Sequence, residues 1–213
     1  MRLGRWGLLL LLAVAGAGLG AAEPVGFQAA FVAFQRLAQQ QVGTPDRVEA
    51  QFAALESDDP LRRPLYAAYR AATQTLRGRD SWWPWEKLRQ TEAGLNGLEK
   101  AMAQLTPEHD RLLLRAVPVS LETRLLAVST FLAVPEFFHR RERGRLWLQQ
   151  GLALPLLQQS PPAFQAHWHF QAAELARQEG DVARERAELL RVLGLAPEVD
   201  VERAARLRLK VLG

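Results

Sequence analysis

The stretch AAELARQEGDVARERAELLRVLGLAPE, residues 172–198, contains the clearest pair of helices in the sequence. On both sides of Gly180-Asp181, apolar residues recur three or four positions apart, which is the period of an amphipathic helix. The upstream stripe is formed by Phe164, Trp168, Ala172 and Leu175, and the downstream one by Val182, Leu189, Leu190 and Leu193. Pro197 ends the second helix. So short a link favours two antiparallel helices packed against each other.

The rest of the chain repeats this pattern. Thr44-Pro45, Thr106-Pro107 and Ser160-Pro161 each place a capping residue before a proline, which is typical of a helix start. No segment shows a sustained two-residue alternation, so no strand is predicted. We expect a break at Pro118 and a helix that starts at Pro135 and runs past Trp147. A further short helix should follow Pro197.

Two other helices are predicted in the first half of the chain. One carries an apolar stripe from Leu61 to Leu76 and should end at Gly78, and the next runs from Trp85 to Met102. Roughly eight or nine helices with short connections result. The prediction is one all-α domain over residues 23–213, built as stacked antiparallel helix pairs.

Residues 163–197 resemble a tetratricopeptide repeat. Ala173 stands where the two helices of that repeat approach closely, Gly180-Asp181 forms the turn, and Pro197 is the terminator. Two residues depart from the pattern: Glu185 replaces a small alanine, and His169 replaces a large aromatic residue. The resemblance implies a superhelical scaffold that binds a peptide or protein in a concave groove. An irregular helical bundle is the alternative arrangement.

Residues 1–22 have the layout of a secretory signal peptide. Arg2 and Arg5 precede an apolar centre, and the small residues 20–22 stand before Glu23, so cleavage is expected after Ala22. The protein is therefore predicted to work in the periplasm or outside the cell. The alternative is a retained membrane anchor over residues 6–22, an uncharged span that approaches the ~20 residues of a membrane helix.

The composition excludes several kinds of functional site. The chain has no cysteine, which excludes disulfides, thiolate metal sites and a cysteine nucleophile. Without Arg2 and Arg5, 25 of the 27 basic residues remain against 23 acidic ones, a net charge of +2 that does not point to nucleic acid as a partner. His167 and His169 lie two positions apart and so point away from each other on a helix. We expect no metal and no cofactor.

The cluster Trp82-Trp83-Pro84-Trp85 is the most unusual local feature. One interpretation is an exposed aromatic platform for a sugar, peptide or protein, with Arg79 beside it. The favoured interpretation is a bulky hinge packed between two helices, because tryptophan often fills such positions. At least one indole should then face the core, with Asp80 or Ser81 capping the helix that follows.

A dense basic run, residues 139–145, contains Arg140, Arg141 and Arg143. It lies between Phe137-Phe138 and Trp147-Leu148 on a predicted helix. A solvated helix face is the favoured interpretation. The other is contact with an anionic partner, either an acidic protein or, weakly, the phospholipid headgroups of a membrane surface.

No catalytic residue is predicted, since the chain lacks the nucleophile and phosphate-binding motifs of common enzymes. The resulting hypothesis is an exported, non-catalytic helical scaffold that binds a protein or peptide partner. One alternative is a cell-wall or polysaccharide hydrolase, which would need a deep cleft pairing Trp82, Trp83 or Trp85 with a carboxylate. The other is a membrane-tethered adaptor that retains residues 6–22.

Overall fold

The computed structural model describes residues 23–39 and 43–213, and its fold is all-α, as the periodicity predicts. The signal segment, residues 1–22, lies outside this part of the chain. The described elements are α1 (Phe27–Ala38), α2 (Pro45–Asp58), η1 (Pro60–Arg62), α3 (Arg63–Asp80), α4 (Pro84–Ala103), α5 (Glu108–Arg111), β1 (Leu113–Leu114), β2 (Val117–Pro118), α6 (Val119–Ala133), η2 (Glu136–Phe138), α7 (Arg141–Leu152), α8 (Pro155–Gln158), α9 (Pro162–Glu179), α10 (Val182–Gly194) and α11 (Val199–Val211).

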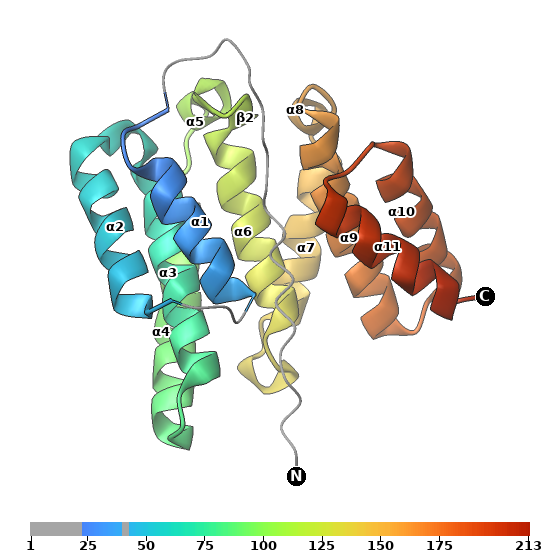
Figure 1. Ribbon diagram of the computed structural model, residues 1–213, viewed down its shortest axis with the longest axis horizontal. Coiled ribbons are helices and arrows are strands. Elements are labelled where there is room, and N and C mark those ends of the chain that lie inside the picture. Colours follow the sequence, from blue (N-terminus) through green and yellow to red (C-terminus); the bar gives the residue numbers. More distant parts are fainter. Residues whose placement is uncertain (1–22, 40–42) are drawn as a thin grey trace.

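Three groups of helices follow one another across the molecule in chain order (Figure 1). Helices α1 to α4 form one end, α6 and α7 the middle, and α9 to α11 the other end. Helix α6 is the central element. Of its residues 119–132, all are buried except Arg124. A helix that is apolar on nearly every side belongs in the interior, because it has no polar face to present to water.

Two local predictions are wrong. Residues 113–118 form a short antiparallel hairpin, β1–β2, in which Leu114 pairs with Val117. Two residues per strand are too few to show alternation in sequence. The helix expected to open at Pro135 is instead the single turn η2, and His139 adopts a left-handed φ of 53° before α7 begins. The break predicted at Pro118 is confirmed, since α6 starts at the next residue.

Aromatic side chains of α1, α2 and α3 fill the core at the N-terminal end. Phe52 and Tyr69 stack with their ring centroids 4.6 Å apart and their planes at 4°. Phe34 meets Tyr69 edge-on, with 5.0 Å between centroids. Buried aromatics contribute most to such a core because each removes a large apolar area from water. Leu61, predicted to lie on this face, is exposed, and Arg62 is buried in its place.

Helices α3 and α4 form a closely packed hairpin. A Cβ on Gly94 would lie 2.5 Å from the carbonyl oxygen of Ala71, and a Cβ on Gly78 would lie 2.8 Å from the backbone nitrogen of Thr91. Real Cβ atoms do not approach backbone so closely, so glycine at both positions lets the helix backbones touch. Helix α3 passes the predicted stop at Gly78 and ends at Asp80.

At the other end, α9, α10 and α11 enclose a small second core around Phe170, Leu189 and Val201. The Gly180-Asp181 turn is as predicted: Gly180 has a φ of 75°, and Asp181 Oδ1 accepts a hydrogen bond from the Arg184 N–H. Val182 and Leu190, expected on the apolar stripe of α10, are instead exposed.

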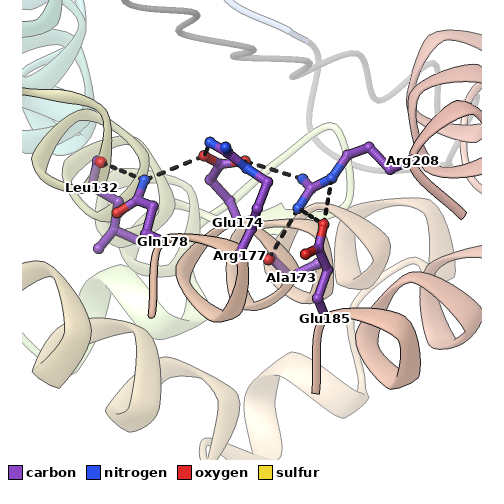
Figure 2. Close-up of polar contacts among 7 residues, drawn as sticks. All are labelled: Leu132, Ala173, Glu174, Arg177, Gln178, Glu185 and Arg208. Carbon is purple, nitrogen blue, oxygen red and sulfur yellow. Dashed lines mark hydrogen bonds and ion pairs between the residues drawn. The ribbon is translucent and has the colours of Figure 1, made fainter. Parts of the chain in front are cut away.

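Polar contacts hold these three helices together. Figure 2 shows the Arg208 guanidinium of α11 between Glu185 of α10 and Glu174 of α9, with nitrogen–oxygen distances of 2.5 and 3.0 Å. His169 Nδ1 lies 2.7 Å from Glu188 Oε2. The two departures from the repeat pattern, Glu185 and His169, are therefore both members of interhelical polar pairs. In Figure 2, Gln178 also donates to the Leu132 carbonyl at 3.0 Å, which joins α9 to α6.

Candidate functional site

The three clustered tryptophans lie on the surface. Trp82, Trp83 and Trp85 are 88%, 56% and 64% exposed. Trp83 and Trp85 stack on each other, with ring centroids 4.8 Å apart and planes at 23°. The prediction that at least one indole faces the core is wrong, and so is the interpretation of this cluster as a packed hinge.

The α3–α4 connection explains this exposure. Residues 81–83 form the tip of the hairpin, and this tip projects beyond α2 (Figure 1). Pro84 opens α4, and the Trp83 carbonyl accepts the first helical bond from the Lys87 N–H at 2.9 Å. Lys87 Nζ also donates to the Arg79 carbonyl at 2.7 Å, which ties the start of α4 to the end of α3. The tip is thus held firmly while its indoles point into solvent. We name Trp82, Trp83 and Trp85 the tryptophan tip.

Arg79 is not part of this surface. Its guanidinium is buried and donates to the carbonyls of Ala38 and Leu37 at 2.9 and 3.0 Å. Its Nε lies 2.7 Å from Asp80. Arg79 therefore anchors the C-terminal end of α1 to α3, where it satisfies carbonyls that the helix leaves open. The capping role expected of Asp80 or Ser81 is also absent, since α4 has no side-chain cap.

The carboxylate nearest in sequence to the tryptophan tip is poorly suited to acid catalysis. A hydrogen bond from Gln90 and one from Arg89, both at 2.6 Å to Glu86, lower the pKa of this carboxyl. A general acid in glycoside hydrolysis needs the opposite, a raised pKa. With every indole more than half exposed, the tip is also convex rather than a cleft.

The basic run does not form one helix face. Arg140 precedes α7, and both Arg140 and Arg143 turn toward Glu99 of α4, with nitrogen–oxygen distances of 3.3 and 2.5 Å. Arg141 points elsewhere and lies 3.7 Å from Glu136. Two of the three arginines therefore connect α7 to α4 across the surface of the bundle.

The histidines of α9 have separate surroundings. His167 is buried, with Nε2 3.9 Å from Glu198, whereas His169 pairs with Glu188. Burial, with a smaller contribution from the Arg115 charge, lowers the pKa of His167 to about 4. Within residues 23–39 and 43–213, no three His, Asp or Glu side chains are arranged to hold a metal ion.

A buried polar cluster was not predicted from the sequence. Glu122 of α6 accepts hydrogen bonds from the Tyr69 hydroxyl at 2.5 Å and from Arg115 at 2.6 Å. Arg115 also lies over the Phe31 ring, 4.0 Å from its centroid. Burial, and secondly the Glu122 charge, raise the pKa of Tyr69. The cluster fastens the β1–β2 hairpin to α1, α3 and α6. The one signal for it in the sequence is Glu122, the single acidic residue between Asp110 and Glu136.

Comparison with protein-family models, curated proteins and solved structures gave no match. The helices over residues 23–39 and 43–213 also include no segment with the length and hydropathy needed to span a bilayer. The assignment of function therefore depends on the surface chemistry of this chain.

Proposed function

We propose that the protein is an exported, non-catalytic helical scaffold that docks a protein or peptide partner through the tryptophan tip. The observation that carries this proposal is the exposure of three tryptophans at one projecting turn. Trp168, by comparison, is fully buried. Exposing such large apolar side chains has no benefit for folding, and tryptophan is among the residues that contribute most binding energy at interfaces.

The rigidity of the tip supports the same role. Because Gly78 and Gly94 allow close backbone contact, the hairpin presents its indoles without a flexible linker. A preorganised surface loses less conformational entropy on binding. The hydrolase alternative is less well supported, since the indoles form a projection and Glu86 has a lowered pKa.

Export and the repeat-like helix pair do not depend on the tryptophan tip. Export rests on the sequence of residues 1–22 alone, and retention of residues 6–22 would make the same scaffold membrane-tethered. We also propose α9–α10 as a tetratricopeptide-like pair, supported by the left-handed Gly180 turn and the fully buried Ala173 between the helices. Glu185 and His169, the two departures from the repeat pattern, each form a polar pair with a neighbouring helix, which is compatible with such a pair.

In-cell crosslinking of the tagged native protein, followed by mass spectrometry, tests the docking proposal. We expect one dominant protein partner that is lost when all three tip tryptophans are replaced by alanine. Each tryptophan should contribute about 2 kcal/mol, which is roughly 30-fold in affinity. The matched control carries Phe137→Ala and Leu207→Ala, two apolar residues that are 53% and 57% exposed elsewhere. Equal capture by both variants would contradict the docking role.

Folding must be unchanged for this comparison to be valid. Because the three indoles are exposed, the triple variant should unfold within about 0.5 kcal/mol per substitution of the parent protein. Amino-terminal sequencing of the native protein tests export, and Glu23 as first residue is the expected result.

A further inference from the structure

A groove at the junction of α4, α6 and α7 holds an unpaired arginine. The groove has a volume of about 720 Å³ and lies over the central helix. Arg124 is the one residue of 119–132 in α6 that is not fully buried, and it lines this groove. Its Nε is buried without a hydrogen-bond partner. Among residues 23–39 and 43–213, no carboxylate lies within ion-pair distance of Arg124.

The other charges of the groove do not compensate Arg124. Lys100, Arg124 and Arg143 line it against one lining carboxylate, Glu99. Glu99 Oε1 is already shared, at 2.5 Å from Arg143 and 3.3 Å from Arg140. The lining residues therefore leave a net charge of +2, three cations minus one carboxylate. A half-buried guanidinium without a counter-ion lowers the stability of the fold. Residues that lower stability in this way are typical of binding sites.

Further lining groups add hydrogen bonding and an apolar wall. Asn96 Oδ1 accepts from Arg140 at 3.0 Å, so its amide NH₂ is the group left to donate into the groove. Trp147 packs on Phe131 with ring centroids 5.0 Å apart, and with Met102 it supplies apolar surface. A groove of this size, with a few convergent polar groups beside an aromatic side chain, suits a small organic ligand.

We propose that this groove binds a phosphate monoester that carries an apolar or aromatic group. A phosphate monoester has a charge of about −1.5 to −2 and three acceptor oxygens, which match the excess charge and the fork of Arg124. The organic group would lie against Trp147. This site is formed by other residues than the tryptophan tip, so its test is independent of the proposed docking function.

Calorimetric titration of the full chain with phenyl phosphate, at low salt and above its second pKa of ~6, tests this proposal. We expect millimolar or tighter binding that weakens as salt is added. Phenol should not bind, because it lacks the phosphate, and inorganic phosphate should bind roughly tenfold more weakly, because it lacks the ring.

Three substitutions locate the site. Arg124→Met should weaken binding about tenfold or more while leaving the melting temperature of the free protein unchanged or higher, because it removes an unpaired charge. Arg47→Met, at an exposed arginine of α2, is the matched control and should bind like the parent protein. Glu99→Gln should tighten binding severalfold by removing the one lining carboxylate. A gain of affinity has no explanation in misfolding.

Each result of these titrations either supports or overturns the phosphate site. Loss of binding in Arg124→Met with gain in Glu99→Gln supports the site. Equal binding by Arg124→Met and Arg47→Met, equal binding of phenol and phenyl phosphate, or no phenyl phosphate binding at all would overturn it. Benzoate binding as tightly as phenyl phosphate would replace the phosphate monoester with a carboxylate. Binding to phosphatidic acid vesicles without binding to phenyl phosphate would replace the soluble ligand with a lipid headgroup.

Discussion

The Arg208→Met substitution should destabilise the C-terminal helices strongly. The Glu185 side chain is 5% exposed, and both of its hydrogen bonds come from Arg208, at 3.0 Å from Nε and 2.5 Å from Nη2. Methionine keeps most of the apolar stem but leaves the Glu185 carboxylate buried without a partner. Breaking a buried ion pair in this way costs about 3–5 kcal/mol in the free energy of unfolding.

The reverse substitution, Glu185→Ala, should cost less. Arg208 is 18% exposed and keeps two other acceptors, Glu174 Oε2 at 3.0 Å and the Ala173 carbonyl at 3.1 Å. Glu185→Ala removes the two hydrogen bonds that Arg208 donates to Glu185 Oε1 but leaves no buried charge without a partner, so we expect a cost of about 1.5–3 kcal/mol. The double variant removes both charges and should be more stable than Arg208→Met alone. The coupling energy of the pair is then about 2 kcal/mol or more.

Urea unfolding of the four proteins, compared at equal m-values, measures this double-mutant cycle. Arg206→Met is the matched control: its side chain is 61% exposed and pairs with Glu202 one turn away, so it should cost less than about 0.5 kcal/mol. This prediction is refuted if the free energy of unfolding of Arg208→Met lies within about 1 kcal/mol of the parent, or if the effects of the two single substitutions are additive. Either result would mean that removing Arg208 does not leave Glu185 as an uncompensated buried charge.

Two other predictions concern packing and pH. Gly94→Ala would place a Cβ 2.5 Å from the Ala71 carbonyl oxygen and should destabilise the protein by about 1–3 kcal/mol. The control, Gly194→Ala, has no atom within 4 Å of the new Cβ and should be neutral or stabilising. Thermal unfolding measures both variants. The pKa of His167 is lowered from 6.5 to about 4 in the folded protein. As the pH drops, the unfolded chain therefore binds a proton at this histidine before the folded protein does, and the free energy of unfolding falls below pH 6.5. From about pH 7 to pH 5 the parent should lose about 2 kcal/mol more than His167→Leu. Parallel pH profiles would refute this.

Residues near one another in sequence determined most of the secondary structure. The prolines that follow Thr44 and Ser160, the Gly180 turn and the Pro197 stop all act within one helical turn, so they can be recognised without the fold. The capping roles predicted for Thr44 and Ser160 are wrong: neither side chain caps its helix, and the Ser160 hydroxyl donates to the Leu156 carbonyl at 3.0 Å instead. The predicted starts at Pro45 and Pro161 and the predicted turn at Gly180 agree within one residue with the observed α2 start at Pro45 and the observed α9 bounds, Pro162–Glu179. The hairpin at residues 113–118 was missed because its strands are too short for a period to show.

The candidate sites depended on tertiary structure. The helical period indicates that one face is buried, but it does not show how far a hairpin projects, so the exposure of Trp82, Trp83 and Trp85 could not be predicted. The partner of Glu185 lies 23 residues away on another helix.

The groove around Arg124 combines side chains of α4, α6 and α7, and nothing near Arg124 in the sequence marks it. Local patterns therefore determined where the helices lie in the chain. Packing between distant helices decided which side chains are paired, which are buried and which remain free to bind.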